Sequence, residues 1–205
     1  MESLPRIGWS RDQIDRQLSA FYDSDPPRRK SAMSVSAHYV SDEIQNVIER
    51  SHNQFSHHHD AVLLTQAGSR QMEQELLSIA GELLSGGTAG TVNTMASSGT
   101  EAAFNALFAA RSRARLERPH IRRPEVVAPY SAHAAYTKIA AYLDLTLRRA
   151  PHDDDLRCDP AAIEDLIGRN TIAIVASAPD WPYGYFDDIP AFGQLATAHG
   201  LWLHV

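Results

Sequence analysis

From residue 91 onward the chain alternates short apolar stretches with helical ones, and this alternation restricts the possible folds more than any other feature. "TIAIVASAP" (171–179) is almost wholly apolar and rich in β-branched residues, as expected of a strand buried on both faces. "PEVVAPY", "TLRRAP" and "LWLHV" are also strand-like, and helical stretches separate them. The alternation predicts an α/β fold, in which helices cover both faces of a mostly parallel sheet.

The helical stretches carry recognisable ends. "DPAAIEDLIGRN" is expected to be a helix that Asp159 caps, with Pro160 in its first turn and Gly168 at its stop. "TEAAFNALFAARSRAR", "AHAAYTKIAAYLDL" and "DIPAFGQLATAHG" are the other helices predicted in this part of the chain.

Residues 1–90 lack this alternation and read as an N-terminal helical segment. Ser10 and Ser41 stand where N-caps of two helices are expected. A third helix, "SRQMEQELLSIAGELL", has one apolar stripe and ends at Gly86-Gly87. We therefore expect two regions, a helical segment at 1–90 and the first part of a larger domain at 91–205.

Composition excludes several classes of protein. Hydrophobic residues make up 43% of the 205 and the net charge is −6, which argues against disorder and against a nucleic-acid partner. The single cysteine, Cys158, cannot form an intramolecular disulfide, and a cytoplasmic setting fits. The first residues have no signal-peptide pattern, and no apolar run approaches the ~18 residues of a membrane span.

The stretch "SSGTE" (97–101) is the first candidate binding site. It stands at the start of a helix, where backbone amides are unsatisfied and the helix dipole is positive. Gly99 permits close approach of a ligand, while Ser98 and Thr100 add hydroxyl donors, so the stretch is competent to bind a phosphate. An ordinary helix cap is the alternative, since serine and threonine favour that position.

Two further candidates follow predicted strands. His133 stands where its ring is able to stack on a flat ligand, although a surface or capping histidine is the simpler interpretation. "SAPDWPYGYFDD" (177–188) contains two prolines and a glycine, which indicates a stiff, shaped loop. A plain connector remains open for this loop.

The histidines at 57–59 and Cys158 carry less chemistry. Three adjacent histidines lack the spacing of metal sites, so a solvated loop is expected there and no metal site is predicted. Cys158 has no redox or catalytic context in the sequence and is interpreted as structural.

In order and spacing these segments resemble the group II pyridoxal-phosphate-dependent decarboxylase family, and within it the sphingosine-1-phosphate lyases. "SSGTEA" is similar to the family's cofactor loop, "SAHAAYTKIAAYLDLTLRRAP" to its histidine segment, and "APDWPYGYFDDI" to its proline-glycine loop. The resemblance implies the first part of the large domain of a fold-type I enzyme. It also implies a pyridoxal 5'-phosphate cofactor and a homodimer for the complete enzyme.

The resemblance also assigns roles to residues. Ser98, Gly99 and Thr100 are implied to hold the cofactor phosphate, His133 to stack on the pyridine ring, and Ser177 to lie near the ring or its 3-hydroxyl. The family's next residue after "LWLHV" is an aspartate that pairs with the ring nitrogen, and a later lysine forms a Schiff base with the cofactor. The only lysines in the sequence are Lys30 and Lys138, and neither matches that position, so we expect an N-terminal part that is inactive alone.

Three functions remain open at this stage. The first is a pyridoxal-phosphate carbon–carbon lyase, with a phosphorylated sphingoid base favoured over an amino acid undergoing decarboxylation. The second is a protein that binds a phosphate ligand without catalysis. A nucleotide-binding α/β domain is disfavoured, because the sequence contains neither a G-x-G-x-x-G motif nor a P-loop lysine.

Overall fold

Four parallel strands form one sheet, and its strand order explains where a ligand would bind. The computed structural model describes residues 7–25, 40–58, 65–85, 92–181 and 183–205. The strands are β1 (Glu125–Pro129), β2 (Thr146–Ala150), β3 (Thr171–Val175) and β4 (Trp202–His204), in the order β2-β1-β3-β4. Every neighbouring pair is parallel, and Val127 pairs with Arg148 on one side and Ile174 on the other. The predicted strands are confirmed.

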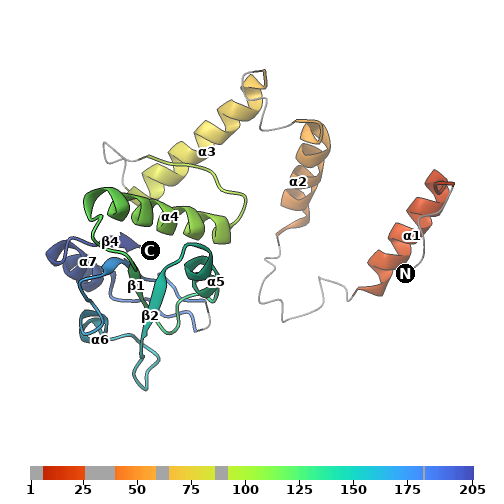
Figure 1. Cartoon of the computed structure of the whole chain (residues 1–205). Coiled ribbons are helices and arrows are strands. Elements are labelled where there is room, and N and C mark those ends of the chain that lie inside the picture. The colour runs from red at the N-terminus through yellow and green to blue at the C-terminus, as the bar shows by residue number, and fades with distance from the viewer. Residues whose placement is uncertain (1–6, 26–39, 59–64, 86–91, 182) are drawn as a thin grey trace. The chain divides into compact units, whose positions relative to one another are not determined.

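Helices cover both faces of this sheet (Figure 1). They are α4 (Gly99–Glu117), α5 (Ala135–Tyr142), α6 (Pro160–Glu164) and α7 (Ile189–Ala198). One buried cluster joins Leu107 of α4 and Ile139 of α5 to Val126 of β1. A second joins Ile163 of α6 and Phe192 of α7 to the opposite face. The predicted α/β class, with a parallel sheet between two helical layers, is confirmed.

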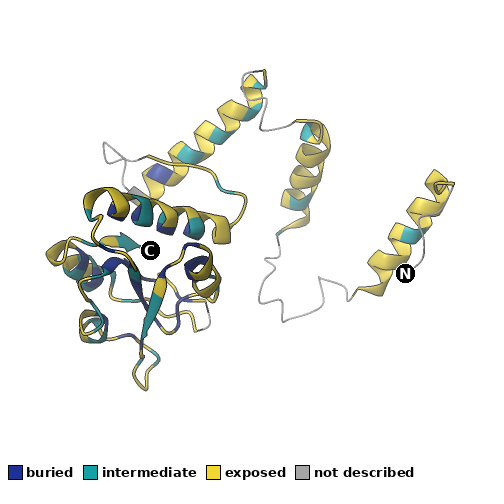
Figure 2. Ribbon diagram, viewed as in Figure 1, coloured by how far each residue is buried: buried dark blue, intermediate teal, exposed yellow. Residues whose placement is uncertain are grey.

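The two central strands, β1 and β3, are buried because each contributes side chains to both clusters. Val126 and Val127 are adjacent in β1 and fully buried, one in each cluster. Alternate side chains of a strand point to opposite faces, so a strand covered on both sides needs apolar residues without interruption. Figure 2 shows the buried residues gathered in the strands and the helix faces toward them.

The helix after β2 is shorter than the sequence suggests. Asp159 caps it as expected, and its carboxylate accepts the Ala161 N–H at 2.9 Å. The helix ends at Glu164, however, whereas Gly168 was expected to end it. The N–H groups of Leu166 and Ile167 donate to carbonyls three residues earlier, so the chain tightens into turns before β3 begins.

The N-terminal helices are α1 (Arg11–Ser24), α2 (Asp42–Phe55) and α3 (Ala67–Ser85). Ser10 and Ser41 cap the first two, as predicted, and Gln13 completes a capping box with Ser10. Neither α1 nor α2 contains a buried residue. The expected stop at Gly86-Gly87 lies outside the described residues.

The chain divides into two compact units, 1–72 and 73–205. The whole sheet and its covering helices belong to the second unit, which is the part that carries the candidate site. The boundary expected from composition, between residues 90 and 91, stays a prediction. Among the described helices, none has the length and apolar character needed to cross a membrane.

Candidate functional site

The carboxyl ends of β1 and β3 define the candidate site. The chain leaves β1 toward β2 on one side and later returns through β3 on the other, so the connections diverge between these two strands. In open parallel sheets, ligands bind at such a switch point, outside the carboxyl ends of the strands. The segments that follow β1 and β3 contain His133 and Ser177. Helix α4 precedes β1 and packs on the same sheet, which brings its first turn to this edge.

The start of α4 combines a closed cap with two free amides. The Ser98 hydroxyl oxygen accepts the Glu101 N–H at 3.2 Å, and the Glu101 carboxylate accepts the Ser97 N–H at 2.6 Å and the Ser97 hydroxyl. The hydroxyl of Ser97, together with its N–H, holds the pKa of Glu101 below its usual value. Within the described residues, the Gly99 and Thr100 amides have no acceptor. Two donors at a positive helix end therefore remain for an anion.

Open space adjoins these donors. A Cβ atom added at Gly99 would meet no heavy atom within 4 Å among its described neighbours, and Thr100 is exposed. The geometry fits a phosphate group at Gly99 and Thr100. Ser98 accepts the capping bond through its oxygen, and its O–H has no acceptor among the described residues, so this hydroxyl is also able to donate to a phosphate.

His133 is exposed, yet its ring has a defined orientation. Its Nδ1 accepts the Ala135 N–H at 3.1 Å, which places the ring proton on Nε2 and caps the first turn of α5. The ring also meets Trp181 edge to face, with centroids 6.0 Å apart. This bond agrees with the capping interpretation, and stacking on a ligand stays a prediction. The same bond holds the imidazole in the segment that follows the carboxyl end of β1.

Ser177 closes the loop that follows β3. Its N–H donates to the Asp187 carboxylate at 2.7 Å, and its carbonyl accepts the Asp187 N–H at 3.0 Å. Burial raises the pKa of Asp187; the Ser177 N–H opposes this shift and nearby Asp180 adds to it. The Ser177 hydroxyl has no hydrogen-bond partner among the described residues, so it is free to meet a ligand.

Asp180, which the sequence did not single out, organises the interior of the same loop. The residue is 4% exposed. One of its carboxylate oxygens accepts the N–H groups of Tyr183 and Tyr185, both at 3.1 Å. Its own N–H donates to the Tyr185 carbonyl at 2.7 Å, and Gly184 turns the chain with a φ of +76°. One buried carboxylate thus fixes the shape of the loop. This explains the defined shape more directly than the proline content from which the sequence predicted it.

Aromatic and imidazole rings connect the loops that follow β1, β2 and β3. His152 lies between Tyr130 and Tyr183, with centroid distances of 6.1 and 6.2 Å. At the end of β4, the His204 ring meets Tyr136 of α5 at 6.0 Å. Burial lowers the pKa of His204 and raises that of Tyr136. These ring contacts hold three loops and a helix together at the carboxyl edge.

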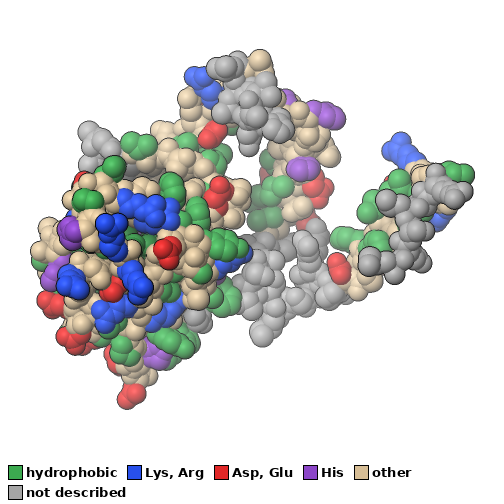
Figure 3. Space-filling model, viewed as in Figure 1, with side chains coloured by type: hydrophobic (Ala, Val, Ile, Leu, Met, Phe, Trp, Pro, Cys, Tyr) green, Lys and Arg blue, Asp and Glu red, His purple; other side chains and the backbone are tan. Residues whose placement is uncertain are grey.

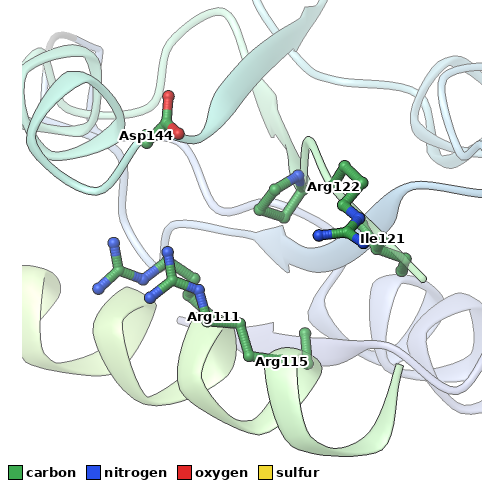
Figure 4. A pocket seen from close by; sticks show the side chains of 7 residues that line it. Arg111, Arg115, Ile121, Arg122 and Asp144 are labelled. Atoms are coloured by element: carbon green, nitrogen blue, oxygen red, sulfur yellow. The ribbon is translucent and has the colours of Figure 1, made fainter. Parts of the chain in front are cut away.

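A hollow at the opposite edge is lined by arginines (Figure 4). Residues 111–123, "RSRARLERPHIRR", hold six arginines and one glutamate, and Figure 3 shows basic side chains gathered on this face. The Arg111 guanidinium donates to the carbonyl of Leu143, which ends α5, at 2.8 Å. The carboxyl end of a helix carries partial negative charge, so Arg111 stabilises the fold there.

The described residues contain no grouping of three or more His, Cys, Asp or Glu side chains suited to a metal; His59 lies outside them. Cys158 is buried and free, and burial raises the pKa of its thiol to about 12. Both observations agree with the structural role that the sequence predicts, because a thiol held protonated is a poor nucleophile.

Comparison with known proteins identifies the family. The model of the pyridoxal-dependent decarboxylase conserved domain matches residues 39–205. The chain belongs to the pyridoxal-dependent decarboxylase family. Its α/β part is the first part of the large domain of fold-type I enzymes. That family uses pyridoxal phosphate, and the free donors at Gly99 and Thr100 fit its phosphate.

The names of the relatives describe two different activities, a lyase and a decarboxylase. A sphingosine-1-phosphate lyase of Arabidopsis thaliana is 43% identical over 54% of this chain and 20% of its own length. A probable L-tyrosine/L-aspartate decarboxylase of Methanocella arvoryzae is 36% identical over 67% of this chain and 36% of its own length. The solved sphingosine-1-phosphate lyase of Burkholderia pseudomallei matches with a TM-score of 0.87 and 27% identity, over all of this chain and 48% of its own. The chain thus spans less than half of each relative.

Proposed function

We propose that this chain is the cofactor-binding part of a pyridoxal-phosphate-dependent lyase that cleaves a carbon–carbon bond in a phosphorylated sphingoid base. The proposal rests on the groups at the carboxyl edge of the sheet. The free amides belong to the first turn of α4, which precedes β1. The oriented His133 ring and the free Ser177 hydroxyl belong to the segments that follow β1 and β3. Similarity of the segments at 131–138 and 178–184 to the lyases supports the substrate class.

Each of these residues has a binding task in the proposal. The Gly99 and Thr100 amides, with the Thr100 hydroxyl, hold the cofactor phosphate at the positive end of α4. His133 would stack on the ring of the bound cofactor, and Ser177 would hydrogen-bond to its 3-hydroxyl. Bound pyridoxal phosphate supplies an electron sink for the pair released when the substrate bond breaks. The residues of this chain hold and orient that group.

An amino-acid decarboxylase is the second candidate, and the Methanocella relative is the observation that favours it. Release of a long-chain aldehyde, measured on a protein that contains this chain, would support the lyase. Release of carbon dioxide from an amino acid would support the decarboxylase. A protein that binds phosphate ligands without either product would be the third outcome.

The proposal extends to assembly and location. Helices α1 and α2 bury none of their residues, which supports a homodimer in which their apolar sides are covered by a second copy. The presence of a single, free cysteine supports a cytoplasmic setting.

Cofactor binding is tested by titrating the chain with pyridoxal phosphate and, in parallel, with pyridoxal, which lacks the phosphate. We expect the phosphate form to bind far more tightly. Thr100→Ala should weaken that binding by ~1.5–3 kcal/mol, the size of a hydrogen bond to a charged group. Thr146→Ala is the matched control, because Thr146 is an exposed threonine at the other end of the strands. Equal affinity for both compounds would contradict the phosphate site.

A further inference from the structure

The guanidinium of Arg149, in β2, makes four hydrogen bonds to the chain between the end of β1 and the first turn of α5. Its Nη1 donates to three carbonyls, those of Pro129 at 3.1 Å, Tyr130 at 3.2 Å and Ala132 at 3.0 Å. Its Nη2 donates to the hydroxyl of Thr137, in the first turn of α5, at 3.2 Å. The acceptors lie 12 to 20 residues before it in the sequence, so one guanidinium joins β2 to both ends of the connection between β1 and α5.

These acceptors bracket His133. Ala132 directly precedes it, and Thr137 follows within one helical turn. The imidazole is then fixed by its bond to the Ala135 N–H, whose position depends on the same turn of α5. Both stretches of backbone that carry His133 are therefore tied to one side chain on the neighbouring strand.

The geometry also shows what the loop would lose without this side chain. Three carbonyl oxygens converge on Nη1, and their partial negative charges repel one another unless a donor stands between them. The described residues provide no carboxylate partner for Arg149, so its charge is balanced by these neutral oxygens alone. Burial lowers the pKa of Arg149, although an arginine stays charged. A planar fork with two donor ends satisfies carbonyls and hydroxyl together, which a lysine ammonium is poorly shaped to do.

We infer that Arg149 is a positioning residue of the cofactor site: through these four hydrogen bonds it sets the place and orientation of the His133 ring. The expected effect of Arg149 on cofactor binding rests on the proposed function. Its expected effect on the His133 ring does not, so an experiment can contradict one of these two claims and leave the other standing.

The preceding residue in the chain, Arg148, provides a matched control. Arg148 lies on the same strand and donates to the Leu166 carbonyl at 2.8 Å, with an ion pair to Glu125 at 3.6 Å. It therefore loses comparable bonds when replaced, but none of them reaches the loop of His133. Arg148→Met measures the general cost of removing an arginine from β2.

The test compares Arg149→Met, Arg149→Lys and Arg148→Met with the original chain. Nitrogen-15 and proton NMR of the ring follow the His133 Nδ1 bond and the contact with Trp181, and denaturation shows that each variant is folded. We expect Arg149→Met to lose both signals and roughly tenfold or more in pyridoxal phosphate affinity. Arg149→Lys should recover them only in part, and Arg148→Met should leave His133 unchanged.

Unaltered His133 signals in folded Arg149→Met would overturn the inference. Full recovery in Arg149→Lys would overturn it too, because charge alone would then suffice. If Arg149→Met does not fold, the contrast between Arg149→Lys and Arg148→Met decides. If the original chain fails to bind pyridoxal phosphate while His133 moves as expected, the positioning role stands and the proposed function falls.

Discussion

His133 has a capping bond to α5 and a proposed stacking role, and two substitutions distinguish these. Its Nδ1 accepts the Ala135 N–H in the first turn of α5, and the residue lies in the segment that follows β1 at the switch point of the sheet. Both His133→Phe and His133→Ala lose the capping bond, but only phenylalanine keeps a flat ring for stacking. Calorimetry with pyridoxal phosphate should therefore show His133→Phe binding more tightly than His133→Ala. Equal losses in the two variants would mean that the ring does not stack on the cofactor.

His204 should give the folded chain a pH dependence. Its burial lowers the pKa from the ordinary histidine value of 6.5, so the unfolded chain takes up this proton before the folded chain does. Its contribution to stability is complete above that value and is lost as the pH falls from there through the folded-state pKa. Chemical denaturation at about pH 7.5 and about pH 5.5 measures this loss.

The variant His204→Gln should lose less stability over the same interval than the original chain. His120→Gln changes an exposed histidine and serves as the control. If His204→Gln and the original chain lose the same free energy of unfolding on acidification, His204 is not the group responsible.

At the scale of elements, the loop after β3 depends on one carboxylate. Asp180 accepts two N–H groups while 4% exposed, and its removal leaves both donors unsatisfied. Asp180→Ala should lower the free energy of unfolding by about 1–3 kcal/mol. It should also loosen Ser177, which the same loop holds. Asp154→Ala, in an exposed turn, is the control. A loop whose amide exchange is unchanged in Asp180→Ala would contradict this role.

The elements differ in how well the sequence predicts them. Strands such as β3 follow from a local run of apolar residues, and the caps at Ser10, Ser41 and Asp159 follow from residue type. The site itself depends on longer-range bonds. Arg149 donates to the carbonyls of residues 17 to 20 positions earlier. Asp180 accepts the N–H groups of Tyr183 and Tyr185 only when the chain turns back on it. Neither carries a local signal, since an arginine in a strand and an aspartate beside a proline suit many surfaces.

At the scale of the whole molecule, the N-terminal helix α1 exposes apolar side chains. Ile14, Leu18 and Phe21 of α1 are 44%, 59% and 62% exposed, and apolar side chains at this spacing form one stripe. We expect a dimer that buries this stripe. Light scattering should show that Leu18→Asp with Phe21→Asp shifts the chain toward monomer, whereas Gln17→Asp leaves the dimer intact. A dimer that persists in the double variant would place the interface elsewhere.

The two ends of the strands offer two possible sites for an anion. The central claim is that the cofactor phosphate binds at the first turn of α4, so the test must distinguish the two sites. Free helix amides lie at the carboxyl edge, and arginines line a hollow at the other. The most direct measurement is an amide NMR titration with pyridoxal phosphate. The proposal predicts that the Gly99, Thr100 and His133 resonances move first and saturate together. Shifts confined to the hollow around Arg115 and Arg122, with Gly99 and Thr100 unmoved, would contradict it.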